Sequence, residues 1–245
     1  SDRPFAGTDR SVRFDGVRFS YKEAEVLHSV SFEIPEGSLT ALVGESGSGK
    51  STLAKLLVHF YDVTGGAVKI GGQDIRDMSI EALNNEISYV AQEQFLFNIS
   101  LLENIRLGKL DATDEEVLAA AEKAQCGEFL ARLEKGIHTM AGDGGKQLSG
   151  GERQRLKLAN ELGRKGNIYV FDEPTTGLHG SDIAKLIKLF DKLVNNRNTI
   201  IIIEHNMDII SQADWIIDIG PGAGKDGGKV LFEGLPNALP EHNVS

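Results

Sequence analysis

This chain of 245 residues contains a single cysteine, Cys126, so it cannot form an internal disulfide. Nothing therefore suggests an oxidising compartment, and the thiol is expected to be a small buried apolar group. The sequence also lacks any apolar run approaching the ~18 residues of a membrane-spanning helix. It has no signal-peptide pattern and begins at Ser1, which suggests a processed or excised polypeptide. A membrane role would have to come through a partner or a segment outside this sequence.

Excess positive charge is lacking as well. There are 26 Lys and Arg residues against 36 Asp and Glu, which gives a formal net charge of −10. Because nucleic-acid binders usually carry a basic face, DNA is a disfavoured partner. Five of the six histidines show no metal-ligand spacing with Cys126, so no structural zinc is expected; they are His28, His59, His138, His179 and His242.

Glycine, by contrast, is abundant, and one glycine-rich stretch organises the rest of the chain. Residues 44–51 fit the phosphate-binding pattern G-x-x-x-x-G-K-[ST]. An apolar run at residues 39–43 predicts a buried strand before it, and helical spacing of leucines predicts a helix after it. Backbone N–H groups of such a loop and the helix N-terminus point at a polyphosphate. The predicted nucleotide-binding residues here are Gly44, Glu45, Ser46, Gly47, Ser48, Gly49, Lys50, Ser51 and Thr52.

Within this loop, Lys50 is expected to reach the β- and γ-phosphates and Ser51 to hold Mg²⁺. The remaining pattern predicts an α/β protein. Short β-like pieces fill residues 12–43, and fully apolar runs at 168–171 and 199–203 predict a parallel sheet buried on both faces. The predicted divisions are a linker or cut end at 1–11, a core with an antiparallel β part at 12–92 and 167–236, a helical subdomain at 93–166, and a tail at 237–245.

A second motif and an acidic pair complete the chemistry. In Leu148-Ser149-Gly150-Gly151-Glu152, Ser149 and Glu152 predict a capping box that opens a helix, and the two glycines leave a second anion site at its N-terminus. Asp172 and Glu173 follow the apolar run at 168–171, where a carboxylate can hold Mg²⁺.

In this order, the three motifs resemble those of the ATP-binding-cassette (ABC) family, and the resemblance covers about residues 12–236. It implies a P-loop NTPase of the ABC-cassette fold, with a parallel core sheet, an N-terminal antiparallel β part and a helical subdomain. It implies ATP and Mg²⁺ as ligands and hydrolysis of ATP. It also implies that Ser149, Gly150, Gly151 and Glu152 face ATP bound to a second cassette in a head-to-tail, ATP-dependent dimer.

The resemblance further assigns individual roles. Glu173 is the expected general base, His205 the switch histidine near the γ-phosphate, and Gln92 the sensor of Mg²⁺, water and the transport partner. Tyr21 lies where the family stacks an aromatic ring on adenine. The alternative of a purely structural residue stays open for His205 and Tyr21. The expected metal ligands are Ser51, Gln92 and Asp172.

Different segments of the chain resemble two different ABC proteins. Residues 92–97 and 139–145 resemble ABC exporters, whereas residues 172–179 and 213–221 resemble the excision-repair ATPase UvrA. His179 stands where transporters usually carry an aspartate, which puts exporter-style coupling of the two sites in doubt. A recombined or engineered chimera, joined near residues 148–156, is the simplest hypothesis.

Three functions follow. The first is the motor domain of an ABC exporter, attached to a transmembrane domain outside this chain and located in the cytoplasm or on the cytoplasmic face of a membrane. The second is a UvrA-like DNA-repair ATPase fragment, which the charge and the lack of zinc modules oppose. The third is an ATP-binding module with impaired turnover.

Overall fold

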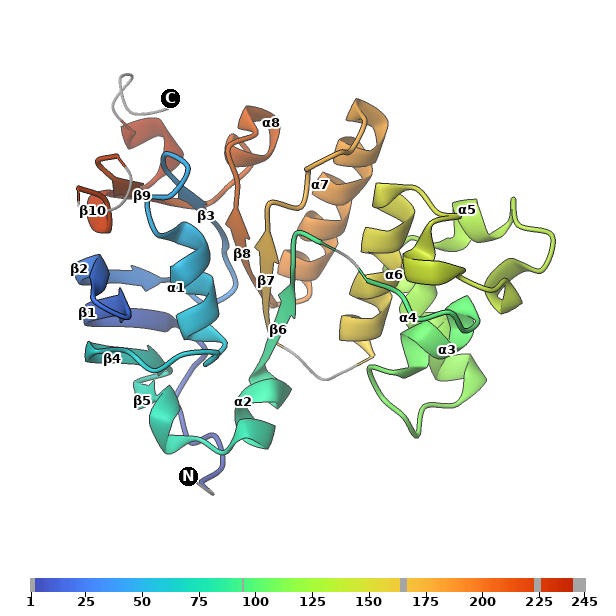
Figure 1. Cartoon of the computed structure of the whole chain (residues 1–245), viewed down its shortest axis with the longest axis horizontal. Coiled ribbons are helices and arrows are strands. Elements are labelled where there is room, and N and C mark those ends of the chain that lie inside the picture. The colour runs from blue at the N-terminus through green and yellow to red at the C-terminus, as the bar shows by residue number, and fades with distance from the viewer. Residues whose placement is uncertain (1–2, 94, 164–166, 223–225, 240–245) are drawn as a thin grey trace.

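The computed structural model describes residues 3–93, 95–163, 167–222 and 226–239, and these form two sheets with helices around them (Figure 1). The smaller sheet has the order β2-β1-β4-β5, and all its pairings are antiparallel. Its strands are β1 (Val12–Tyr21), β2 (Ala24–Ile34), β4 (Gly65–Ile70) and β5 (Gln73–Asp74). Alternating buried and exposed residues along β1 give this sheet one face in the core.

The larger sheet has the order β10-β9-β3-β8-β7-β6 and is parallel except for the edge pair β9–β10. Its strands are β3 (Leu39–Val43), β6 (Ile87–Val90), β7 (Ile168–Asp172), β8 (Thr199–Ile203), β9 (Trp215–Gly220) and β10 (Lys229–Gly234). Every residue of β3, β7 and β8 is buried, because both faces of these strands are covered. The predicted α/β fold with a parallel core sheet and an N-terminal antiparallel part is confirmed.

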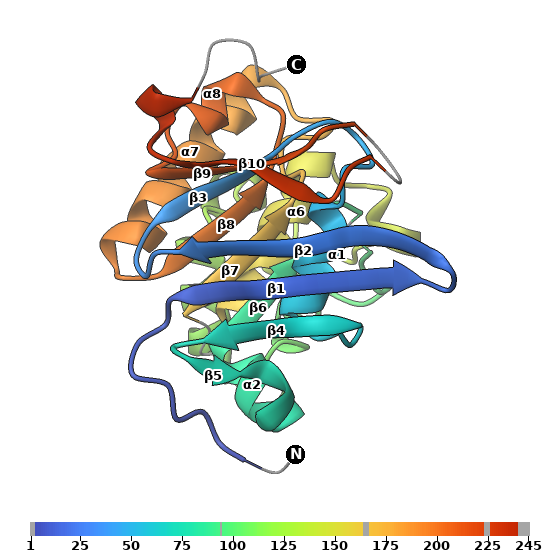
Figure 2. The same ribbon diagram turned by 90° about the vertical axis from the view of Figure 1, so that its left-hand side faces the viewer.

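The helices divide between the two faces of the larger sheet. Figure 1 shows α1 (Lys50–Leu57) between the two sheets, and α6 and α7 on the other side of β6–β8. Figure 2 shows β2, β1 and β4 running across the strands of the larger sheet. The helices after α1 are α2 (Ile80–Glu86), α3 (Leu101–Arg106), α4 (Asp114–Lys123), α5 (Gly127–Leu130), α6 (Gly150–Leu162), α7 (Gly180–Asn195) and α8 (Met207–Ile210).

Helices α3 to α6 gather at one end of the molecule, on the right of Figure 1. Helix α6 begins at the predicted capping box: Ser149 Oγ accepts from the N–H of Glu152, and the Glu152 carboxylate accepts from the N–H of Ser149. Among the described helices, none has both the length and the apolar character required to cross a membrane.

The N-terminal segment, predicted as a linker or cut end, is held against the body of the protein over its described residues. The Arg3 carbonyl accepts from the N–H of Ser79, and the N–H of Thr8 donates to the Gly71 carbonyl. Arg10 Nε lies 2.6 Å from a carboxylate oxygen of Glu86. At the other end, residues 240–245 of the predicted tail lie outside the described residues.

Candidate functional site

The phosphate loop joins β3 to α1 and depends on glycine at two positions. Gly44 has a φ of 140°, and a Cβ there would lie 2.1 Å from the carbonyl oxygen of Ile219 in β9. Gly49 has a φ of 108°, and its Cβ would lie 2.9 Å from a methyl group of Leu27. Residues with side chains rarely adopt these backbone angles. Glycine at both positions therefore lets the backbone of the loop lie close to its neighbours and to a ligand.

Lys50 is buried at the start of α1. Its Nζ donates to the carbonyl oxygens of Gly44 at 2.5 Å and Glu45 at 2.8 Å. Burial lowers the pKa of the Lys50 ammonium, and surrounding carboxylates oppose that shift. These carboxylates belong to Glu173, Asp172, Asp218 and Glu45. The Lys50 ammonium thus lies inside the loop and interacts electrostatically with these four carboxylates. A bound polyphosphate could replace the carbonyls of Gly44 and Glu45 as its hydrogen-bond partners.

Ser51 and Asp172 meet although they are 121 residues apart. Ser51 Oγ lies 3.4 Å from one carboxylate oxygen of Asp172, and the hydroxyl of Tyr89 donates to the other at 3.0 Å. A hydroxyl beside a carboxylate supplies the hard oxygen ligands that Mg²⁺ prefers, so this pair fits the metal. Gln92, the third predicted ligand, directs its amide nitrogen elsewhere.

Gln92 is brought to Glu173. Its Nε2 donates to the Glu173 carboxylate at 3.0 Å and lies 3.5 Å from Thr176 Oγ1. Glu173 has a φ of 46°, an unusual left-handed conformation for a residue with a side chain. Its N–H donates to the Ile203 carbonyl at 2.9 Å, which fixes the turn after β7. The predicted base and sensor are therefore in direct contact.

Glu204, which sequence reasoning did not assign to the site, holds the neighbouring loops together. Its side chain is 1% exposed and accepts from both the N–H and the hydroxyl of Thr175, at 2.9 and 2.6 Å. It also accepts from the N–H groups of His205 and Asn206 at 3.1 Å. A carboxylate directly after the four consecutive isoleucines of β8 was the available signal. The contact connects the loop carrying Glu173 with the loop carrying His205.

Two pockets meet at Glu173. One of about 550 Å³ is lined by the phosphate loop, Glu173, Glu204 and His205. The other, of about 410 Å³, is lined by Gln92, Glu173 and Gly150 among others.

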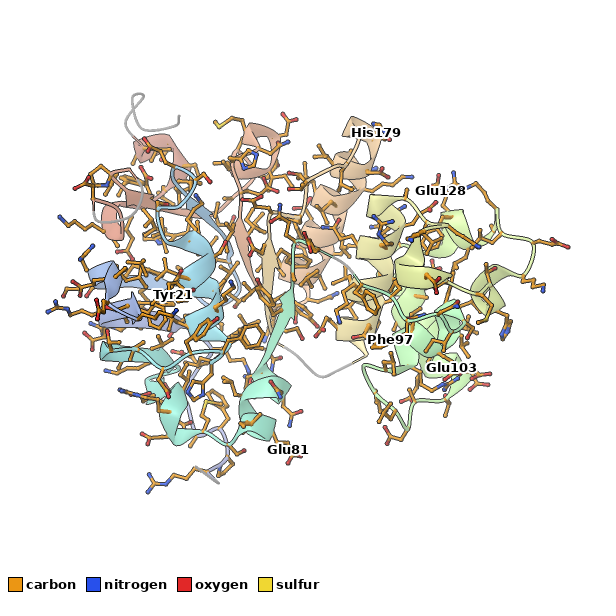
Figure 3. The ribbon with its side chains drawn as sticks, viewed as in Figure 1. Tyr21, Glu81, Phe97, Glu103, Glu128 and His179 are labelled. Atoms are coloured by element: carbon orange, nitrogen blue, oxygen red, sulfur yellow. The ribbon has the colours of Figure 1, made fainter. Side chains whose placement is uncertain are left out.

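Tyr21 is not among the lining residues of the phosphate pocket. Its ring is 38% exposed and its hydroxyl lies 3.3 Å from Thr52 Oγ1 in α1, which places it beside the phosphate-loop helix. Figure 3 shows Tyr21 on the β1 side and His179 at the start of α7, far from each other.

The Ser149–Glu152 motif is not brought to the phosphate loop of its own chain. It opens α6, which lies on the other side of β6–β8 from α1 (Figure 1). A Cβ on Gly150 would meet only open space, whereas one on Gly151 would lie 3.2 Å from Leu178. The exposed N-terminus of α6 is therefore free of side-chain bulk where it faces outward.

Asp218 was also not assigned to the site from the sequence. Its burial leads to a testable prediction about the stability of the fold. Its side chain is 2% exposed, and Oδ2 has no hydrogen-bond partner among the residues that the structure describes. Burial raises the pKa of this carboxyl above 3.8, and the Lys50 cation opposes the rise. We expect Asp218→Asn to stabilise the fold by about 1–2 kcal/mol near neutral pH, because an ionised, partly unpaired group is replaced by a neutral one.

The stabilising effect of Asp218→Asn should depend on pH. A raised folded-state pKa means that the folded protein holds the proton more tightly than the unfolded chain, so stability falls as pH rises from about 3.8 through the folded pKa. The advantage of Asp218→Asn should therefore be larger at pH 7 than at pH 4 in urea unfolding. An equal advantage at both pH values would contradict this account.

The fold and site define a P-loop nucleoside triphosphatase: a glycine loop lies between a buried parallel strand and a helix, and two consecutive carboxylates stand at the end of another strand of the same sheet. The ABC transporter family matches residues 27–176, more than half of the chain. The chain belongs to this family and is an ATPase domain of it. Binding of ATP and Mg²⁺ is general to such domains.

Several relatives are similar over most of this chain. The mitochondrial iron-sulfur clusters transporter ATM1 of Saccharomyces cerevisiae is 40% identical over 231 residues, 93% of this chain and 34% of that protein. The ATP-dependent lipid A-core flippase of Haemophilus ducreyi is 39% identical over 93% of this chain and 38% of that protein. A solved bacterial Atm1-family ABC exporter with ATP bound superposes with a TM-score of 0.87 at 36% identity, over 96% of this chain and 40% of that one. The chain thus spans about a third of the length of these curated relatives.

These comparisons do not support a chimera with a UvrA-like second half. Each relative aligns with about 93% of the chain, so the match continues through residues 148–156, where a junction was expected. Both core clusters combine residues from before and after this junction, and one of them joins the two sheets.

Proposed function

We propose that this chain is the motor domain of an exporter-type ABC transporter, which hydrolyses ATP between two copies of the cassette. The observation that carries the proposal is the separation, within one chain, of the phosphate loop from the Ser149–Glu152 motif. Glu173 lines both the pocket formed by the phosphate loop and the pocket that includes Gly150 of the motif. A second chain, placed head to tail, supplies the motif that each phosphate pocket lacks.

The phosphate loop binds the polyphosphate. Its backbone N–H groups and the N-terminus of α1 face the anion, and Lys50 exchanges the carbonyls of Gly44 and Glu45 for phosphate oxygens. Tyr21, half-exposed beside α1, offers a ring for the adenine to stack on.

Ser51 and Asp172 would hold Mg²⁺, and the amide oxygen of Gln92, which is not the atom that contacts Glu173, would be a further ligand. When bound, the ion neutralises negative charge on the β- and γ-phosphates. Asp172 is suited to this role because its carboxylate already lies against the hydroxyl of Ser51.

Glu173 acts as the general base that takes a proton from the attacking water. Its contact with Gln92 Nε2 orients the carboxylate, and the hydrogen bonds of Glu204 hold the loops on either side. His205 lines the same pocket and contacts the γ-phosphate. Positioning and charge stabilisation supply most of the rate.

The transmembrane partner lies outside this chain and docks near Gln92. Phe95 and Phe97 pack edge to face with ring centroids 5.3 Å apart, yet they are 67% and 55% exposed. Two exposed aromatic rings beside the sensor glutamine suit an apolar contact. The relatives are about three times as long as this chain, which is consistent with an attached domain. Such a domain would place the cassette on the cytoplasmic face of a membrane.

The decisive test is complementation between two inactive variants. Ser149→Arg blocks the motif but keeps the phosphate loop, and Lys50→Met does the reverse. Each alone should hydrolyse ATP slowly, and their mixture should regain activity that rises with protein concentration, because one composite site per mixed dimer is complete. A mixture no more active than its parts would exclude the composite site, and ATP binding without turnover at any concentration would leave only a binding module.

A further inference from the structure

We infer that Tyr89 is a positioning residue for the metal carboxylate: its hydroxyl fixes the orientation of Asp172 so that the other oxygen faces Ser51. The inference rests on the proposed function, because it concerns the Mg²⁺ site of the same pocket. It is carried by one hydrogen bond, one ring contact and the strand register that brings them together.

The register explains why Tyr89 reaches this carboxylate. In the parallel pair β6–β7, Tyr89 lies opposite Val170. Side chains alternate between faces along a strand, so Asp172, two residues after Val170, points to the same face as Tyr89. A phenol is long enough to span this diagonal, and its hydroxyl lies 3.0 Å from Asp172 Oδ2.

The ring of Tyr89 is itself held in place. Phe60, just after α1, packs against it edge to face with ring centroids 5.7 Å apart. Tyr89 therefore connects three parts of the site: the segment just after the phosphate-loop helix, the strand that leads to Gln92, and the carboxylate of Asp172 at the end of β7.

The hydroxyl acts only as a donor. An ionised carboxylate can only accept hydrogen bonds, so the Tyr89 hydroxyl is the donor in this contact. A carboxylate with one oxygen on Tyr89 and the other near Ser51 has little freedom to rotate. The ligand oxygen is thus preorganised before any metal binds, which lowers the entropic cost of binding.

The test measures how much Mg²⁺ strengthens nucleotide binding. A fluorescent ATP analogue is titrated into the wild type and Tyr89→Phe, with Mg²⁺ and with EDTA. We expect equal affinity in EDTA and an about tenfold smaller gain from Mg²⁺ in Tyr89→Phe, the size of a hydrogen bond to a charged acceptor. Tyr169→Phe, which removes a phenol hydroxyl from the other face of β7, should behave as the wild type in both conditions.

Three results would overturn the inference. They are an unchanged or larger gain from Mg²⁺ in Tyr89→Phe, an equal loss of affinity with and without Mg²⁺, and the same loss in Tyr169→Phe. If Tyr89→Phe does not fold, Phe60→Ala tests the same point from an exposed position, and it should reduce the gain from Mg²⁺ without changing affinity in EDTA. A wild type with no gain from Mg²⁺ would refute the proposed function itself, and this inference with it.

Discussion

Glu173→Gln should reduce ATP hydrolysis by about 10²–10⁴-fold while leaving ATP binding intact, because a positioned general base contributes about that much and an amide cannot take the proton. The substitution is nearly isosteric. A glutamine oxygen can still accept from Gln92 Nε2, which lies 3.0 Å from the present carboxylate. The backbone of the turn, held by the Ile203 carbonyl and by the hydrogen bonds of Glu204, does not depend on the lost charge.

Single-turnover hydrolysis and nucleotide affinity, measured on the same preparation, separate chemistry from binding. Glu93→Gln provides the matched control, because Glu93 is an exposed glutamate beside Gln92 that lines only the second pocket. It should keep nearly wild-type turnover. Turnover in Glu173→Gln within about tenfold of the wild type would assign the base elsewhere and leave Glu173 an orienting role.

Lys50→Met should weaken ATP binding by about 100-fold or more, because it removes a charge-assisted contact to phosphate from a buried site. The negative charges around Lys50 increase the expected loss of ATP affinity. The carboxylates of Glu173, Asp172, Asp218 and Glu45 all act on the Lys50 ammonium, so without the cation the pocket presents uncompensated negative charge to a polyanion.

Equilibrium titration with a fluorescent ATP analogue measures this loss. Lys55→Met removes the same kind of side chain from the last turn of α1 and should bind normally. Thermal unfolding is needed in parallel, because Lys50 also donates to two loop carbonyls whose loss of a partner can loosen the loop. Unchanged affinity in a folded Lys50→Met protein would mean that the amine stays on these carbonyls when ATP binds.

Local features of this protein were predictable from sequence because they depend on residues close together in the chain. The phosphate loop needs glycines at fixed offsets, and the capping box at Ser149 and Glu152 needs a three-residue spacing. The apolar runs of β3, β7 and β8 predicted a sheet covered on both faces. The resemblance to the ABC family added the order of the motifs, and the family match agrees with it.

The expected Mg²⁺ ligands show what the sequence could not predict. It grouped Ser51, Gln92 and Asp172, but in the structure only Ser51 and Asp172 are adjacent, while Gln92 contacts Glu173. Which of several polar groups near a strand end face each other depends on rotamers and hydrogen-bond partners. Those are decided by packing around the site, and motif spacing does not encode them.

The sequence by itself thus determined the class of protein, the phosphate loop and the helix that the second motif opens. Only the tertiary structure decided the contacts of Tyr89 with Asp172, Gln92 with Glu173, and Glu204 with Thr175. The members of each pair are 83, 81 and 29 residues apart, and they meet because the strand order β3-β8-β7-β6 aligns the carboxyl ends of parallel strands. Hydrophobic periodicity predicts that a strand exists, but the neighbour and register of that strand follow from the packing of the whole sheet.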